Sequence, residues 1–104
     1  MAIGLQYPHI EKLEHEPARL QRLPRIRVAQ LVADYLAYGW SADEMCRQHP
    51  HLLPAEAHAA MGYYFDHQAE IDAELAAELK EFDDAQHELN GSPLRQKMRS
   101  KGLL

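Results

Sequence analysis

Hydrophobic residues early in the chain recur at the spacing of one helical face. Between positions 28 and 36 they fall at i, i+3, i+4, i+7 and i+8, which gathers them into a single stripe of an α-helix. These residues are Val28, Leu31, Val32, Tyr35 and Leu36. The pattern predicts a helix over Val28–Tyr38, followed by Gly39 as a left-handed C-terminal cap.

Two shorter signals predict the next helices. Ser41, with Glu44 three residues later, is typical of a capped helix start, so a second helix should cover about Ala42–Gln48. Pro50 should stop that helix. Pro54 can open a third helix at its first position, where the missing N–H of proline has no cost.

The carboxyl-terminal half contains few helix breakers. After the predicted start of the third helix, the next breaker is Asn90–Gly91. Residues 66–88 are rich in Ala, Glu, Leu and Gln, so we expect one long helix or two helices joined near Asp66–His67. Ser92–Pro93 should cap and open a short last helix that runs to Lys101 and ends at Gly102.

The first 24 residues differ from the rest because three prolines interrupt them. We expect an irregular arm over residues 1–24, since each proline fixes φ and removes a backbone donor. In Arg25–Val28 polar and apolar residues alternate, which predicts a short strand with both arginines on one face. A strand this short needs a partner, and we expect a second chain of a homodimer to supply it.

Length and composition fit a single domain. The 104 residues are 46% hydrophobic and 26% charged, which leaves room for one core. Within it we distinguish the arm (1–24), a three-helix bundle (25–68) and a C-terminal helical extension (69–104). No apolar run suits a membrane span and no signal-peptide pattern is present, so we expect a cytoplasmic location, which the single cysteine also fits.

Charge is distributed unevenly along the chain. The net charge is -5, which argues against a dedicated nucleic-acid binder. From Asp34 to Glu88 there are 13 acidic residues, and the basic ones are Arg47 and Lys80. The two ends are therefore basic and the middle is acidic.

Two sets of residues are candidates for contact with DNA. The first is a strip on and beside the arm that comprises Arg19, Arg22, Arg25 and Arg27. A dimer would double this strip into a basic ribbon, although it could equally be solvated or face a protein. The second is the start of the third helix, with Ala55, Glu56, His58, Ala59 and Gly62 expected to be exposed. None of these is a cation at neutral pH, so this helix would contact phosphates poorly.

Two features near the carboxyl terminus are candidates for binding a protein partner. Apolar residues at helical spacing form a seam that suits either an intermolecular groove or packing on the chain's own bundle. The seam comprises Ile71, Leu75, Leu79, Phe82 and Leu89. A basic cluster follows, which comprises Arg95, Lys97, Arg99 and Lys101. It could pair with acidic groups of a partner, or form an ordinary cationic last helix favoured by the helix dipole.

Other side chains suggest no enzyme and no cofactor. The chain has no glycine-rich phosphate loop, no Gly-x-Ser-x-Gly elbow and no metalloprotease helix. His58 and His67 are too far apart for two metal ligands on one helical face, and Cys46 should be a small core residue. Trp40 and the trio Tyr63–Phe65 should pack in the core, with the first or last ring of the trio available to an interface.

Four segments, taken in order, resemble a known family. They are Arg25–Val28, Gly39–Met45, His49–Leu52 and Ala59–His67. The family is domain of unknown function 433. Its pattern reads arginine-isoleucine-x-valine, glycine-hydrophobic-serine-proline-x-glutamate, hydrophobic-proline-x-leucine and alanine-alanine-leucine-x-tyrosine-tyrosine. The resemblance covers about Arg25 to Asp72.

This resemblance implies a homeodomain-like helix-turn-helix bundle and a role as an antitoxin encoded beside a PIN-like nuclease toxin. With the helix pattern, it gives an expected fold class that is mainly α: a small helix-turn-helix three-helix bundle with an irregular or short-strand N-terminal arm and extended C-terminal helices. Where the family has threonine or serine before the third helix, this chain has Leu53, so that helix start should depend on Pro54 alone.

Three functional hypotheses follow. The first is an antitoxin that dimerises through its amino-terminal segment and binds a PIN-like ribonuclease toxin through its C-terminal helices, with operator DNA as an additional ligand. The second is a DNA-binding transcriptional regulator without a toxin, which requires the four arginines to form one exposed stripe. The third is a structural interaction module.

Overall fold

Five helices follow a two-stranded sheet in the residues that the computed structural model describes, 7–85 and 93–103. The strands are β1 (Ile10–Glu11) and β2 (Arg19–Leu20), and the helices are α1 (Val28–Tyr38), α2 (Ala42–Gln48), α3 (Pro54–Asp66), α4 (Gln68–Ala85) and α5 (Pro93–Ser100). The predicted mainly α fold with a short-stranded arm is confirmed. Across these two ranges, no helix is both long and apolar enough to cross a membrane.

The boundary between α1 and α2 forms where the local signals predict it. Gly39 takes a φ of 71°, and its N–H donates to the Tyr35 carbonyl at 2.8 Å, which closes α1. The Ser41 hydroxyl accepts a hydrogen bond from the Glu44 N–H at 3.1 Å and so caps α2. Both predictions are confirmed because each depends only on residues within about one helical turn.

α3 begins at Pro54, as predicted, but its first turn has a second support. Oε1 of Glu56 accepts a hydrogen bond from the Leu53 N–H at 2.9 Å, which satisfies the donor just before the helix. α3 and α4 meet at His67, whose N–H donates to two carbonyls of the last turn of α3 at 2.9 and 3.0 Å. The alternative of two helices is therefore the correct one.

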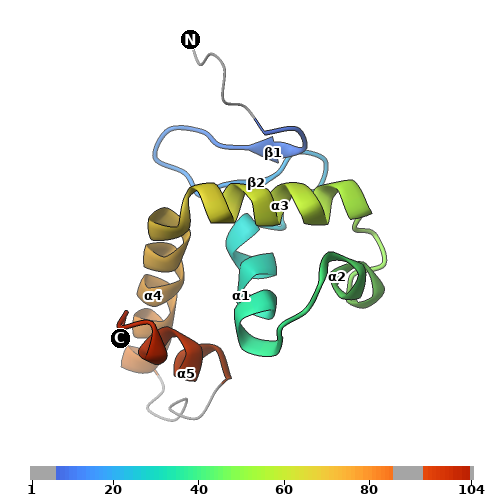
Figure 1. The fold of residues 1–104 in the computed structure, drawn as a ribbon. Coiled ribbons are helices and arrows are strands. Elements are labelled where there is room, and N and C mark those ends of the chain that lie inside the picture. The colour runs from blue at the N-terminus through green and yellow to red at the C-terminus, as the bar shows by residue number, and fades with distance from the viewer. Residues whose placement is uncertain (1–6, 86–92, 104) are drawn as a thin grey trace.

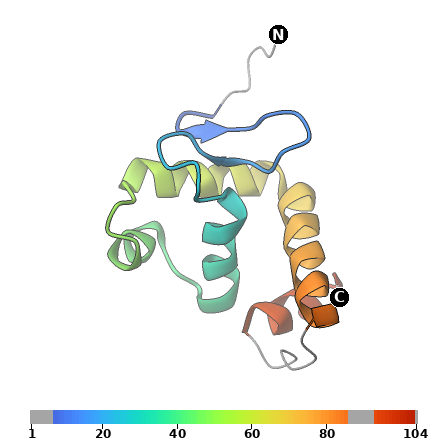
Figure 2. The ribbon, with the colours of Figure 1, turned by 180° about the vertical axis from the view of Figure 1, so that it is seen from behind.

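α3 runs across the molecule and separates the sheet from most of the helices (Figure 1). The β1–β2 sheet lies on one side of α3, and α1 and α4 extend from its other side. α1 lies between α2 and α4 in both views, and α5 closes the end of the bundle beside α1 and α4 (Figure 2). One face of α5 thus looks toward the space between α1 and the end of α3.

The core draws side chains from every helix. Tyr64 of α3 is 1% exposed and is among the largest fully buried side chains. Ile71 and Leu75 of α4 and Met98 of α5 belong to the same buried cluster. In its described part, the C-terminal extension therefore shares the core of the first three helices.

The arm folds back on its own chain. Residues 25–27, predicted as part of a strand, form a turn that ends in a single antiparallel bridge between Arg27 and Arg19. The Val28 N–H donates to the Ala18 carbonyl at 3.0 Å as α1 begins. The strand prediction is wrong because an alternation of four residues also fits a turn that leads into a helix. The backbone partner expected from a second chain is supplied within the chain.

The burial of α5 predicts that this helix stabilises the whole domain. Met98 has 0% exposure, so Met98→Ala should leave a cavity and lower the free energy of unfolding by about 2–4 kcal/mol. Chemical denaturation followed by circular dichroism measures this change. Arg99→Ala, an exposed position on the same helix, is the matched control and should leave the unfolding curve unchanged. Equal curves for all three proteins would show that α5 does not belong to the cooperative core.

Candidate partner-binding site

Arg22, a candidate DNA contact, is engaged with α3. Its Nε and Nη2 donate to the two carboxylate oxygens of Glu56 at 2.8 and 2.7 Å, and Nη2 also donates to the His51 carbonyl at 2.6 Å. Glu56 is 1% exposed. The hydrogen bonds from Arg22 hold the pKa of Glu56 below its usual value, against the opposing effect of burial. The expectation that Glu56 is exposed for reading bases is therefore wrong.

Arg27 is engaged with α4. Its guanidinium forms ion pairs with Glu74 and Glu78, which lie one turn apart on that helix. Burial raises the pKa of Glu74 even though Arg27 counteracts that effect. Because Arg27 directly precedes α1, this ion pair links the start of α1 to α4.

Arg19 is engaged within the arm. Its Nε lies 2.8 Å from Glu11 Oε1, and its Nη1 lies 3.2 Å from Glu16 Oε1. Arg25 is exposed at the turn before α1. Of the four candidate arginines, three thus pair with carboxylates of the same chain, and the structure does not bring the four together as one open cationic stripe.

The predicted apolar seam faces the protein's own core where it can be followed. Leu75 is 2% exposed, and Leu79 is partly buried against the same cluster. Packing on the chain's own bundle, the second alternative considered for the seam, holds for these two residues. Leu89 and the side chain of Phe82 lie outside the described part of the chain.

The basic cluster divides into a buried member and outward ones. Arg95 is 3% exposed, and its Nη2 donates to the Leu79 carbonyl at 3.0 Å. Arg95 thus links α5 to α4 and offers little surface to a partner. Lys97 and Arg99 are exposed, whereas the side chain of Lys101 is 27% exposed. Three of the four basic positions are thus at least partly accessible to solvent, and their contact with a partner stays a prediction.

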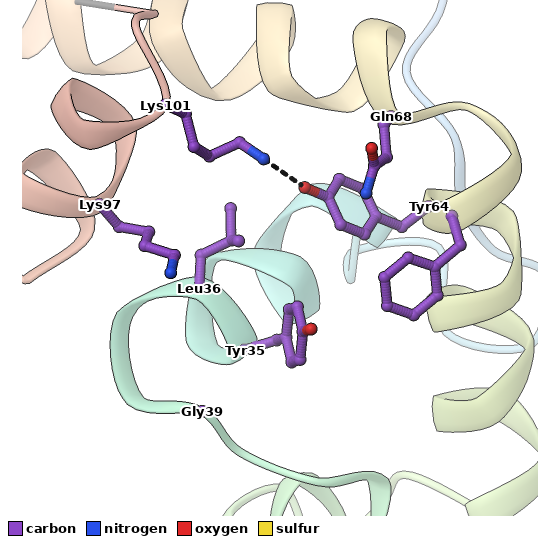
Figure 3. Close-up of a pocket in the computed structure, with 8 residues that line it drawn as sticks. Tyr35, Leu36, Gly39, Tyr64, Gln68, Lys97 and Lys101 are labelled. Atoms are coloured by element: carbon purple, nitrogen blue, oxygen red, sulfur yellow. Dashed lines mark hydrogen bonds between the residues drawn. The ribbon is translucent and has the colours of Figure 1, made fainter.

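A cleft of about 440 Å³ opens between α1, α3 and α5 (Figure 3). Its lining comprises Tyr35, Leu36, Gly39, Tyr64, Phe65, Gln68, Lys97 and Lys101. Lys97 extends from α5, and Lys101 from the turn that follows it, toward α1 and α3 (Figure 3). Lys101 Nζ lies 3.5 Å from the Tyr64 hydroxyl and 3.4 Å from Asp72 Oδ2. The charged residues of the lining are therefore two cations, in a chain of net charge -5.

Tyr64 forms the polar floor of this cleft. Its hydroxyl donates to Asp72 Oδ1 at 2.9 Å, and both residues are buried. Burial and then the Asp72 carboxylate raise the pKa of Tyr64, so the phenol stays protonated at neutral pH. The floor therefore presents a neutral hydroxyl, and the positive charge comes from the lysines at the side.

Aromatic rings lie in the cleft lining and on the residues that flank Gly39 in the sequence. The ring of Tyr35 meets that of Phe65 edge to face, with centroids 5.9 Å apart. Tyr38 stacks on Trp40 with centroids 5.5 Å apart, on either side of Gly39. Phe65 and Tyr38 are 55% and 59% exposed. Exposed rings beside cations are typical of protein-binding surfaces.

Only part of this surface is predicted from the sequence. The last ring of the trio is expected to be available to an interface, which fits the exposure of Phe65. Trp40 is expected in the core, and no sequence signal points to Tyr38. Trp40 is in fact partly buried. One signal could have found part of the patch, because Phe65 directly follows the inward-facing Tyr64. Tyr38 continues the spacing of Leu31 and Tyr35, so helical periodicity alone does not predict its exposure.

Metal binding and thiol chemistry receive no support from the described ranges. No group of three or more His, Cys, Asp or Glu side chains there is arranged to hold a metal ion. Cys46 is partly buried, and this burial raises the pKa of its thiol, which keeps it in the unreactive protonated form at neutral pH.

Residues 22–64 match the model of a family described as "Protein of unknown function (DUF433)". The match supports the resemblance drawn from the sequence motifs and covers the chain from Arg22 through α1 and α2 to Tyr64. It includes both partners of the Arg22–Glu56 ion pair, whereas Lys97 and Lys101 lie beyond it. Neither the curated proteins nor the solved structures gave a significant match.

The buried carboxylate of Glu56 predicts a defined dependence of stability on pH. Because its pKa is lowered in the native state, the ion pair contributes fully above the ordinary glutamate pKa of about 4.3 and is lost as pH falls through the native value. Glu56→Gln should lower the free energy of unfolding by about 2 kcal/mol at pH 7. The difference from the wild-type protein should shrink as the pH falls below about 4.

Chemical denaturation at several pH values between 7 and 3 measures this effect. Glu14→Gln, on the exposed β1–β2 loop, is the control for removal of a carboxylate and should follow the wild-type curve at every pH. A Glu56→Gln curve parallel to the wild-type curve down to pH 3 would contradict the assigned role of the ion pair.

Proposed function

We propose that the protein is a binding module and not an enzyme, and that its partner is an acidic protein which it neutralises in the manner of an antitoxin. The observation that carries the proposal is the exposure of two large rings, Tyr38 and Phe65, together with the cleft that Phe65 lines beside two lysines. Large exposed rings provide contact area at low entropic cost, and lysines add charge selectivity.

The resemblance to the antitoxin-like family supports a PIN-like ribonuclease toxin as the partner. Such nucleases gather carboxylates to hold divalent metal ions, so their active sites are acidic. Lys97 and Arg99 project from α5 and are the natural groups to oppose those carboxylates. In this proposal α5 covers the acidic site, and the aromatic surface supplies most of the contact area.

DNA binding receives less support as the main function. If α2 and α3 act as a helix-turn-helix, α3 would present Ala55, His58 and Gly62 to the groove, and none of these is a fixed cation. The pairing of Arg19, Arg22 and Arg27 with carboxylates removes most of the expected phosphate contacts. Dimerisation through the arm stays a prediction, without the intermolecular strand on which it relied.

Co-expression with a PIN-like ribonuclease encoded beside this gene tests the proposal. The ribonuclease alone should arrest growth, and this protein should restore growth and co-purify with it. Tyr38→Ala should reduce co-purification by about tenfold, because interface aromatic residues contribute about 1–3 kcal/mol each. Leu13→Ala removes a similarly exposed apolar residue (44% exposed) from the β1–β2 loop, on the other side of α3, and should have no effect.

Point variants are preferable to removal of the tail in this test. A truncation after residue 88 would delete Met98 from the core, so loss of rescue would reflect unfolding as well as lost contact. A neighbouring nuclease that is toxic but neither associates with this protein nor is neutralised by it would refute the antitoxin proposal.

A further inference from the structure

We propose that the cleft between α1, α3 and α5 is a receptor for an acidic side chain flanked by an aromatic or aliphatic one on an extended peptide segment of the partner. The inference rests on the proposed function for the protein nature of the partner, and it adds the chemistry that the cleft selects. The carboxylate would lie between Lys97 and Lys101, and the flanking apolar group would lie against Tyr35 and Phe65.

The charge of the cleft lining favours an anionic ligand. Lys97 forms no ion pair with a carboxylate in residues 7–81 and 93–103, and its ammonium extends toward Leu36 at the edge of the cleft (Figure 3). Lys101 shares Asp72 with the Tyr64 hydroxyl, at 3.4 Å and 2.9 Å respectively. An ammonium has three donors, so Lys101 keeps donor capacity for a second anion. Lys97 and Lys101 are four residues apart and both line the cleft, so a carboxylate that enters it would be attracted by both ammonium groups.

The wall opposite the lysines is apolar and favours an aromatic or aliphatic group. Tyr35 and Phe65 present their rings from two different helices, and Leu36 lies beside them in the lining. Gly39 lines the rim with backbone alone, and a Cβ added there would meet nothing within 4 Å, so the entrance is open. Anionic and apolar groups on one ligand would therefore be accommodated together.

The volume of the cleft favours a short peptide segment. About 440 Å³ lies toward the lower end of the range for small-ligand sites, roughly 300–1,000 Å³. Such a cleft fits one or two side chains of a peptide and not a folded element. A nucleic-acid strand is a poorer occupant, because strands are held by a continuous path of cations, whereas two line this cleft in a chain of net charge -5.

A titration with designed peptides, followed by the backbone amide shifts of the ¹⁵N-labelled full-length protein, tests the inference. The probe is an acetylated and amidated Gly-Phe-Glu-Phe-Gly peptide, and its matched control replaces Glu by Gln. Shift changes should gather at Tyr35–Gly39, Tyr64–Gln68 and α5. The Gln peptide should bind at least about fivefold more weakly, since it loses the charge-assisted hydrogen bonds.

Two variants, Lys97→Gln and Arg99→Gln, distinguish binding in the cleft from nonspecific electrostatic attraction of the peptide to α5. Lys97→Gln should weaken binding of the Glu peptide by about five- to tenfold. Arg99→Gln removes the same charge from the same helix at an exposed position outside the lining, and should change the affinity by less than about twofold. Equal losses in both variants, or equal binding of the Glu and Gln peptides, would overturn the inference.

Two further arms keep this inference distinct from the proposed function. Tighter binding of a five-nucleotide oligouridylate than of the Glu peptide, abolished by Lys97→Gln, would assign the cleft to nucleic acid and overturn the peptide proposal. If the ribonuclease co-purifies equally with the wild-type protein and Lys97→Gln, the cleft inference fails while the antitoxin proposal stands. If the Glu peptide binds as expected but the ribonuclease does not associate, the antitoxin proposal fails while the cleft inference stands.

Discussion

The fold depends on one buried charge, the carboxylate of Glu56 at the start of α3. It is 1% exposed, and burial of an ionised group is unfavourable unless partners replace its water. Both oxygens are satisfied, by the guanidinium of Arg22 and by the backbone N–H of Leu53. The same carboxylate therefore fixes the first turn of α3 and holds the arm against it. Because α3 separates the sheet from α1 and α4, this contact fixes how the arm lies against the helical bundle.

The arginines near the amino terminus consequently serve the fold. Arg22 links the arm to α3, Arg27 links the start of α1 to Glu74 and Glu78 of α4, and Arg19 stays within the arm. Each pair neutralises charge that would otherwise be available to phosphates. Lys97 and Arg99 on α5 are exposed, as are Arg25 at the turn before α1 and Lys80 on α4. Among the described residues, exposed cations without a carboxylate partner are therefore spread over several parts of the chain, and α5 carries two of them close together in sequence.

What could be predicted from the sequence divides by the range of the interactions involved. The bounds of α1 and α2 follow from apolar periodicity, Gly39 and the Ser41 cap, all of which act within a turn or two. The Arg22–Glu56 and Arg27–Glu74 pairs join residues 34 and 47 positions apart, so no local pattern contains them. For the same reason Arg95 was grouped with exposed cations although it packs against the end of α4. The cleft was not predicted because three helices must be placed before its walls exist.

The cleft is lined partly by residues of the matched family segment and partly by residues that lie beyond it. Tyr35 and Tyr64, from its wall and floor, lie within the matched residues 22–64, and Phe65 follows directly. Its cations, Lys97 of α5 and Lys101 just after that helix, lie well beyond the match. The shape of a ligand's apolar part would then be set by the segment that resembles the family, and the preference for an anion by the helix that follows. That preference requires α5 to dock correctly, and Met98 in the core is what docks it. A substitution that weakens the packing of α5 on the core is for this reason expected to weaken the selectivity of the cleft as well.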